Sequence, residues 1–151
     1  NLAAALLTVI STGKSMEEII PNIQDVKISG RLDVLPNIGQ DFTVMVDYAH
    51  TPNGIKNLLN FVHTLDINRS IVVIGSAGER DRIKRPIMGK TVLDNASYAI
   101  FTYEDPRSED PRDIIEMMIK DIKDTHSNYE IVIAKINGIL ERATKPLKTG
   151  L

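Results

Sequence analysis

Beyond about residue 40, short runs of apolar residues alternate with longer stretches in which apolar residues recur every three or four positions. A continuous apolar run is typical of a strand buried on both faces, whereas the longer recurrence is typical of an amphipathic helix. The runs predict strands over residues 42–46, 71–74, 97–102 and 130–134. The recurring stretches predict helices over about 52–65, 84–95, 111–124 and 137–147. Strands and helices in alternation predict a Rossmann-like α/β fold, with a mainly parallel sheet and helices on both faces.

The first strand of this series is also predicted to be the second half of a β-hairpin. Residues 28–35 form the other half, and the Pro-Asn-Ile-Gly sequence at 36–39 is typical of a turn. Upstream, residues 2–12 and a short stretch over about 15–21 are predicted as helices.

The chain begins inside a predicted helix and ends soon after another, so we expect it to be a fragment of a longer protein. Residues 1–28 are predicted to be the helical tail of a preceding domain. Residues 29–151 are predicted to be the α/β domain, truncated at its C-terminal end. A length of 151 residues and an apolar fraction of 42% suit one compact domain with a short piece of a neighbour.

Charge and composition exclude several classes of function. A formal net charge of −2 gives no electrostatic reason to expect nucleic-acid binding. No run approaches the roughly 18 apolar residues of a membrane helix, so no membrane partner is predicted. The absence of cysteine excludes disulfides, a thiol nucleophile and thiolate metal sites, and it fits a cytoplasmic location. His63 and His126 have no partner at metal-ligand spacing, and no metal site is predicted.

Three polar loops follow predicted strands, over residues 47–52, 75–86 and 103–111. Ligands of parallel α/β sheets bind at the carboxyl ends of the strands. In the first loop, the carboxylate of Asp47 suits a ribose diol, and Tyr48 and His50 suit stacking on a base. The alternative is that Asp47 or Thr51 caps the next helix and His50 is a surface residue.

The second loop combines glycines with cations. Gly75 and Gly78 allow close approach of a ligand to the backbone, and carboxylate or phosphate groups suit the cations Arg80, Arg82, Lys84 and Arg85. The Gly-Lys-Ser/Thr ending of a Walker loop and the G-x-G-x-x-G fingerprint are both absent. The alternative is that the glycines serve only the turn.

The third loop mixes acidic side chains with one arginine. Glu104 and Asp105 suit an ammonium group and Arg107 suits a carboxylate, which together suit a zwitterion such as an amino acid. The alternative is a solvated turn whose acidic residues favour the N-terminus of the following helix.

Four ordered blocks carry a family resemblance. They are Gly30-Arg31; Val46–Pro52; Gly78–Asp81 with Lys84–Pro86 and Met88-Gly89; and Asp105–Arg107 with Glu109–Pro111. Together they resemble the Mur ligase family, and within it the MurE-type ligases that extend UDP-N-acetylmuramoyl-L-Ala-D-Glu by a third amino acid. The resemblance covers roughly residues 1–140 and implies the C-terminal domain of a three-domain ligase, preceded by the tail of the central domain.

The resemblance implies an ADP-forming amide ligase of cell-wall synthesis. Its substrates are ATP, UDP-N-acetylmuramoyl-dipeptide and an amino acid, and its cofactor is Mg²⁺. The central domain of the family supplies the P-loop, the magnesium ligands and a carbamylated lysine. We therefore expect no catalytic residue in this chain, no activity of the chain alone, and a monomeric cytoplasmic parent.

Carried over by position, the resemblance gives two sets of binding residues. The nucleotide set is Asn1, Arg31, Asp47, Tyr48 and His50, and the amino-acid set is Arg80, Glu104, Asp105 and Arg107. The family's specificity motif usually reads Asp-Asn-Pro-Arg in enzymes that use meso-diaminopimelate, whereas this chain reads Glu104-Asp-Pro-Arg107. Arg107 favours meso-diaminopimelate, but the extra charge of Asp105 favours a distal ammonium, as on lysine or ornithine.

Three other functions remain open. A folylpolyglutamate synthase shares the chemistry and domain plan, although its first loop reads more like Asp-Gly-Ala-His-Asn-Pro. A non-catalytic Mur-like nucleotide-binding module would lack the P-loop and lysine upstream. A stand-alone dinucleotide-binding domain is disfavoured by the missing glycine fingerprint.

Overall fold

The structure is a computed structural model that describes residues 2–23, 26, 28–36, 39 and 41–133. The chain divides into two compact units, residues 1–48 and 49–151, which are described separately. Among the described helices, none is long and apolar enough to cross a membrane.

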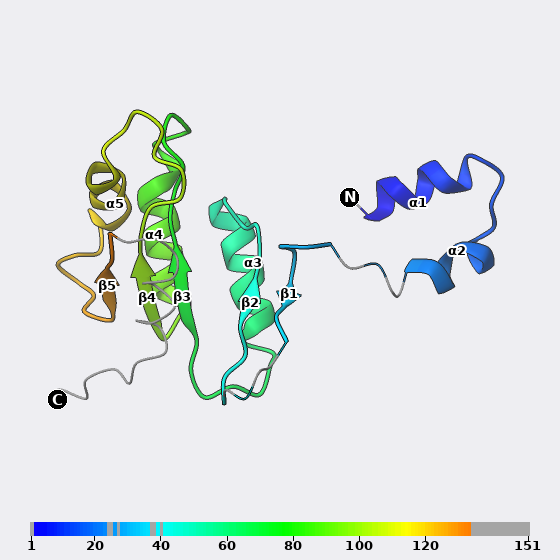
Figure 1. Cartoon of the computed structure of the whole chain (residues 1–151), viewed down its shortest axis with the longest axis horizontal. Helices are drawn as coiled ribbons and strands as arrows, with labels where there is room; N and C mark the ends of the chain where they lie inside the picture. Colours follow the sequence, from blue (N-terminus) through cyan, green and yellow to red (C-terminus); the bar gives the residue numbers. More distant parts are fainter. Residues whose placement is uncertain (1, 24–25, 27, 37–38, 40, 134–151) are drawn as a thin grey trace. The chain divides into compact units, whose positions relative to one another are not determined.

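The second unit is built on a parallel sheet. Its strands β3 (Ile71–Ile74), β4 (Tyr98–Phe101) and β5 (Tyr129–Ile131) lie side by side in the order β3-β4-β5 (Figure 1). The helices α3 (Pro52–Val62), α4 (Lys84–Asn95) and α5 (Pro111–Ile119) alternate with them along the chain. The predicted alternation of strand and helix is therefore confirmed, and the fold is Rossmann-like α/β.

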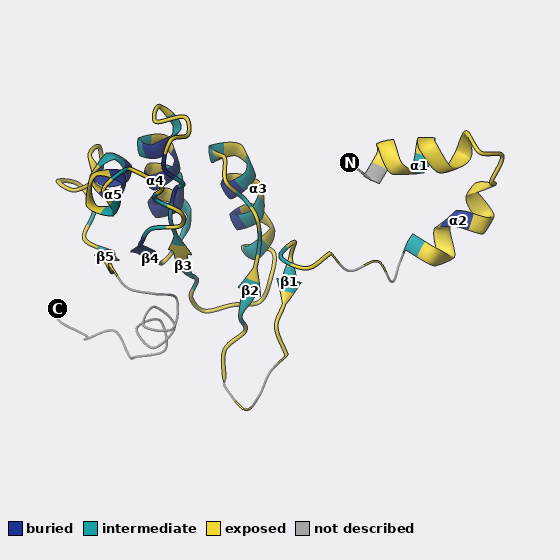
Figure 2. Ribbon diagram, turned by 45° about the horizontal axis from the view of Figure 1, so that its top comes forward, coloured by how far each residue is buried: buried dark blue, intermediate teal, exposed yellow. Residues whose placement is uncertain are grey.

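The central strand β4 has buried residues on both faces. Ala99 and Phe101 face one cluster, while Tyr98 and Ile100 face a second cluster with Val132. Helices α3, α4 and α5 all contribute to the first cluster, where the buried residues are concentrated (Figure 2). The predicted helix over about 137–147 lies outside the described residues.

Capping residues set where two of these helices begin. The Thr51 hydroxyl accepts a hydrogen bond from the Gly54 N–H at 3.1 Å and starts α3. The Asp110 carboxylate accepts from the Arg112 N–H at 2.8 Å and starts α5. The cap of α3 is thus Thr51 and not Asp47.

Helix α5 ends five residues before the predicted end at about 124. After Ile119 the chain tightens, and the Ile122 N–H donates to the Ile119 carbonyl, three residues back, at 3.0 Å. Bonds of this spacing are typical of a tightened helix end. Ile122 is nevertheless fully buried, which is why its apolar position extended the predicted helix.

The first unit contains two helices, α1 (Leu2–Ile10) and α2 (Met16–Ile23). Ser15 and Glu18 cap α2 reciprocally: the Glu18 N–H donates to Ser15 Oγ at 3.4 Å, and the Ser15 N–H donates to Glu18 Oε2 at 3.0 Å. Pro21 lies inside α2, which continues to Ile23.

The same unit contains the predicted antiparallel hairpin, but its strands are shorter than predicted. Strand β1 (Asp33–Val34) pairs with β2 (Met45–Val46). The predicted start at residue 28 is wrong, because Gly30 and Leu32 have positive φ angles of 71° and 45° and turn the chain there. The Asp33 carboxylate stabilises this turn by accepting the Gly30 N–H at 3.1 Å.

Candidate functional site

Three of the predicted nucleotide-binding residues lie together on the hairpin, and we call them the hairpin group: Arg31, Asp47 and Tyr48. Asp47 directly follows β2, and its Oδ2 accepts a hydrogen bond from the Leu32 N–H at 2.9 Å. This bond supports the left-handed backbone of Leu32, which a leucine adopts only at a cost. The Arg31 guanidinium carbon lies 4.7 Å from the centre of the Tyr48 ring, a cation–π contact.

The remaining predicted nucleotide-binding residues are not part of the hairpin group. His50 belongs to the second unit, where it is exposed and its carbonyl accepts a hydrogen bond from Lys84 Nζ at 3.0 Å. Asn1 lies outside the described residues.

The second and third loops approach each other backbone to backbone. The Gly78 N–H donates to the Asp105 carbonyl at 2.7 Å, and a Cβ at Gly78 would overlap the Pro106 carbonyl oxygen. A Cβ at Gly75 would lie 2.8 Å from the Glu104 nitrogen. The glycines therefore serve more than the turn, because they let the loops meet.

Charged side chains continue this contact between the loops. Arg107 Nη1 lies 3.9 Å from Glu79 Oε2, and Arg107 Nε lies 3.7 Å from Asp105 Oδ2. The Ser108 hydroxyl donates to Glu79 Oε1 at 2.6 Å. This hydroxyl, together with the Ser108 N–H, holds the pKa of Glu79 below its ordinary value. We call these four residues, Glu79, Asp105, Arg107 and Ser108, the loop group.

Two members of the loop group have a left-handed backbone. Glu79 has a φ of 53° and Arg107 has a φ of 51°. Together with Leu32, they are the non-glycine residues with positive φ in the part of the chain that the structure describes. Strained backbone of this kind is concentrated at functional sites. Arg107 is itself a predicted ligand residue, and Leu32 and Glu79 each neighbour one in sequence.

A buried ion pair lies beneath the loop group and was not predicted from the sequence. Arg85 Nη1 and Nη2 lie 2.8 and 2.9 Å from Glu109 Oε2 and Oε1, and the Arg85 side chain is fully buried. Arg82 also pairs with Glu109, at 3.2 Å. The hydrogen bonds from Arg85, followed by the Glu79 N–H, lower the pKa of Glu109 to about 2. The second-loop prediction is thus wrong for Arg85, which anchors structure instead of facing a ligand.

A signal for this anchor was present in the sequence. Arg85 precedes the buried residues Met88, Gly89 and Val92 of α4 by three, four and seven positions. Residues at these spacings share one face of a helix, so Arg85 lies on the buried face. A charge there calls for a buried partner.

The other predicted amino-acid-binding residues, Arg80 and Glu104, are exposed. With Asp105 and Arg107 they place two cations and two carboxylates on adjoining loops that follow parallel strands. Such a set is suited to an amino acid, since guanidinium groups bind carboxylates and carboxylates bind ammonium groups.

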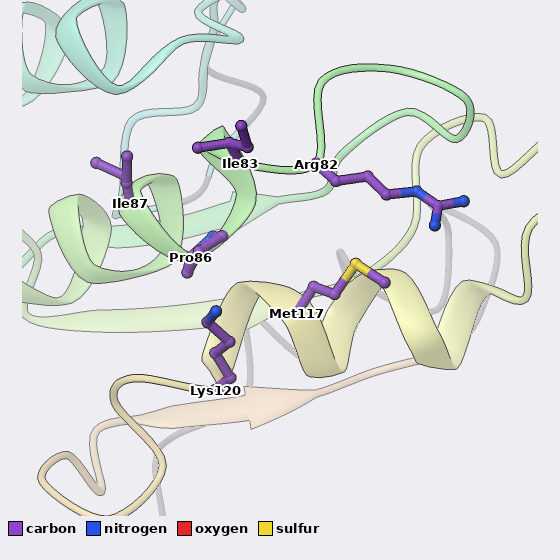
Figure 3. Close-up of a pocket in the computed structure, with 6 residues that line it drawn as sticks. All are labelled: Arg82, Ile83, Pro86, Ile87, Met117 and Lys120. Carbon is purple, nitrogen blue, oxygen red and sulfur yellow. The ribbon is translucent and has the colours of Figure 1, made fainter.

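An open groove of mainly apolar character lies elsewhere, along α4 and α5 (Figure 3). Ile83 and Ile87 project from the α4 side, Met117 projects from α5, and Lys120 projects from the residue that follows α5. The groove is lined by Arg82, Ile83, Pro86, Ile87, Met117 and Lys120, none of which belongs to the predicted nucleotide or amino-acid sets. In the described part of the chain, no three His, Asp or Glu side chains are placed to hold a metal ion.

The parallel sheet and the charged loops after its strands define a Rossmann-like α/β domain, and domains of this class bind ligands at the carboxyl ends of their strands. The family model described as Mur ligase, glutamate ligase domain, matches residues 30–149, and the chain belongs to this family.

Relatives of known name are similar to most of this chain. The UDP-N-acetylmuramoyl-L-alanyl-D-glutamate–2,6-diaminopimelate ligase of Listeria monocytogenes is 40% identical over 126 residues, covering 83% of this chain and 26% of that protein. The ligase of the same name from Geobacillus kaustophilus is 42% identical over 119 residues, covering 78% of this chain and 24% of that protein. The chain thus spans about a quarter of the length of these relatives.

Solved structures agree on the fold. A structure of a UDP-N-acetylmuramoyl-L-alanyl-D-glutamate–2,6-diaminopimelate ligase matches 97% of this chain and 30% of that chain, with a TM-score of 0.70 and 28% identity. Folylpolyglutamate synthase from Thermotoga maritima matches 90% of this chain and 31% of that chain, with a TM-score of 0.63. At 24% identity, the second match shows a shared fold only.

Proposed function

We propose that this chain is the C-terminal part of an ATP-dependent, ADP-forming ligase that joins meso-diaminopimelate to UDP-N-acetylmuramoyl-L-Ala-D-Glu. The loop group carries this proposal, because Arg107 is held between Glu79 and Asp105 at the ends of parallel strands. An arginine in that position is suited to the distal carboxylate of diaminopimelate, which lysine and ornithine lack. The names of the relatives support the same amino acid.

The proposal gives each group of residues a role. Arg31, Asp47 and Tyr48 of the hairpin group, with Asn1 and His50, contact the nucleotide. Arg80 and Arg107 bind the carboxylates of the amino acid, and Glu104 and Asp105 bind its ammonium groups. These contacts position the substrate, and positioning can contribute several kcal/mol to lowering a barrier.

The chemistry follows from the substrates. ATP transfers its γ-phosphoryl group to the carboxylate of the dipeptide, the free amine of the amino acid attacks the acyl phosphate, and phosphate leaves as the amine loses a proton. Mg²⁺, when bound, neutralises charge on the phosphates. The resemblance to the family implies that its ligands belong to the rest of the parent, and we assign no step here through the metal.

The proposal also includes the organisation of the parent. Residues 1–28 would end a central ATPase domain, and residues 29–151 would form the C-terminal domain. The parent would be a monomer in the cytoplasm, with no nucleic-acid or membrane partner.

Phosphate release by the full-length parent tests the function. The assay contains ATP, Mg²⁺ and UDP-N-acetylmuramoyl-L-Ala-D-Glu, with diaminopimelate, lysine or ornithine added separately. We expect far more release with diaminopimelate than with lysine or ornithine, and none from residues 1–151 alone. Release with lysine or ornithine only would correct the amino acid. No release with any of them, from folded protein, would contradict the ligase, and release with a folate and glutamate would favour a folylpolyglutamate synthase.

A further inference from the structure

Helices α4 and α5 form a close-packed frame beneath the two loops. Gly89 of α4 leaves no room for a Cβ, which would overlap the Met118 carbonyl oxygen of α5. Val92 and Met118, which belong to the same cluster, are fully buried. Each helix therefore has little freedom to shift relative to the other.

The buried ion pair links the start of these two helices. Arg85 lies in the first turn of α4, and Glu109 directly precedes Asp110, the N-cap of α5. Both Glu109 oxygens accept from the Arg85 guanidinium, at 2.8 and 2.9 Å, and the exposed fractions of the two side chains are 9% and 0%. Arg85 Nη2 also donates to the Ala77 carbonyl in the second loop, at 3.1 Å. A bidentate pair with this burial fixes orientation as well as distance.

Glu109 also reaches the left-handed residue of the second loop. The Glu79 N–H donates to Glu109 Oε1, while the Glu79 carboxylate accepts from the Ser108 hydroxyl. These two links cross between the loops in opposite directions. Glu79 directly precedes Arg80 in the sequence, and Ser108 directly follows Arg107. The two hydrogen bonds therefore hold the chain next to both predicted ligand residues.

We propose that Glu109 is a positioning residue that fixes the spacing of Arg80 and Arg107, so that affinity for the amino acid depends on it without contact between Glu109 and substrate. The inference rests on the proposed function for its substrate. The chemical reason is that Glu109 offers only acceptors to three donors: Arg85, Arg82 and the Glu79 N–H. Because the pKa of Glu109 is lowered to about 2, the carboxylate is ionised and accepts these hydrogen bonds at neutral pH.

Glu109→Gln tests this inference because it keeps the shape and changes one acceptor into a donor. The new NH₂ group faces either the Arg85 guanidinium or the Glu79 N–H, and neither can accept a hydrogen bond. Glu109→Asp keeps the charge with a shorter side chain, and Arg85→Lys keeps the charge but loses the bidentate geometry. Glu116→Gln, at an exposed position of α5, is the matched control.

Steady-state kinetics of the full-length parent give the first readout. We expect Glu109→Gln and Arg85→Lys to raise the KM for diaminopimelate about tenfold, since small displacements of positioning groups have large effects. The KM values for ATP and the UDP-dipeptide should stay within about twofold of wild type. Glu109→Asp should restore part of the loss, and Glu116→Gln should change nothing. An unchanged amino-acid KM in folded Glu109→Gln overturns the inference, and so does an equal rise in all three KM values.

Hydrogen exchange in the full-length parent gives a second readout that needs no activity. We expect the amides of Glu79 and Ser108 to exchange faster in Glu109→Gln than in wild type, and not in Glu116→Gln. Unchanged exchange at these amides overturns the link between the loops. If wild type releases no phosphate with any amino acid, the proposed function fails instead, and the exchange result still decides the link.

Discussion

The hairpin group and the loop group are held by different means. On the hairpin, Asp47 bonds to the Leu32 backbone and Arg31 contacts the exposed ring of Tyr48. In the loops, Glu109 and Arg85 form a bidentate pair in which the arginine is fully buried. The first arrangement rests on surface contacts within a two-stranded hairpin, and the second rests on a packed helix pair.

This difference indicates how ready each group is to bind. Two-stranded hairpins are marginal by themselves in water, so we expect the hairpin group to gain its final order from the nucleotide or from the rest of the parent. The loop group lies on a core that fully buries Phe101 and Met118, and we expect it to be ordered before the amino acid arrives. Preorganised charges bind and position a substrate with less ordering cost.

The largest expected effect is on the free energy of unfolding, and it compares the core beneath the loops with the hairpin. Phe101→Ala removes a fully buried ring from the cluster beneath the loops and should lower the free energy of unfolding of the chain by about 3–5 kcal/mol. Val34→Ala, at a hairpin position that is 55% exposed, should lower it by less than about 0.5 kcal/mol. Urea unfolding of both variants measures the contrast, and equal losses would show that the hairpin is as firmly packed as the sheet.

The next effect separates the two groups by substrate. Arg107→Ala removes a charge-assisted contact worth about 1.5–3 kcal/mol and should raise the KM for the amino acid about tenfold to a hundredfold in the full-length parent. Asp47→Asn should raise the KM for ATP instead. Arg112→Ala, at an exposed arginine of α5, is the control for lost charge. An unchanged amino-acid KM in Arg107→Ala would remove this residue from the site.

A smaller effect concerns the choice of amino acid. Asp105→Asn removes the negative charge that lies 3.7 Å from Arg107 and leaves its guanidinium freer to bind a second carboxylate. We expect kcat/KM for diaminopimelate relative to lysine to rise severalfold, and less than about tenfold. A rise in relative activity with lysine would mean that Asp105 does not face the distal end of the substrate.

The smallest expected effect is a change of stability with pH, which comes from the carboxylate of Glu109. Because the pKa of Glu109 in the folded chain is about 2, below its ordinary 4.5, the carboxylate stabilises the fold fully above pH 4.5. That contribution is lost as the pH falls from 4.5 towards 2. The difference in melting temperature between wild type and Glu109→Gln should therefore shrink over this range. A constant difference would place the lost stability elsewhere.

The sheet and its helices could be predicted because both patterns, the continuous apolar runs and the apolar residues at every third or fourth position, follow directly from which residues are buried. The hairpin strands were predicted too long, since their apolar residues continue through a turn that depends on Gly30 and on the bond from Leu32 to Asp47. That bond joins residues 15 apart in sequence, and no local pattern encodes it. The end of α5 was missed because Ile122 is buried outside the helix.

The three loops of the candidate site could be predicted from the sequence, but the hydrogen bonds and ion pairs that join them could not. The loops follow from the ends of parallel strands, and the resemblance to the family supplied the residues. The loop composition groups Arg85 with the exposed cations, whereas its spacing from Met88 and Val92 places it on the buried face of α4. Its partner Glu109 lies 24 residues away and is fixed only by the packing of α4 against α5. The ligand roles of Arg80 and Arg107 stay predictions until the kinetic tests.

The contact of Gly78 with Asp105 and Pro106 has a consequence for how this domain can change over time. The gap between the two loops is set by main-chain atoms, which substitution of neighbouring side chains leaves in place. Under the proposed function, residues such as Arg80 and Asp105 would vary on a constant frame, and we expect single substitutions there to change the amino-acid preference. Gly78 itself is the exception, because a Cβ there would overlap the Pro106 carbonyl oxygen and force the two loops apart.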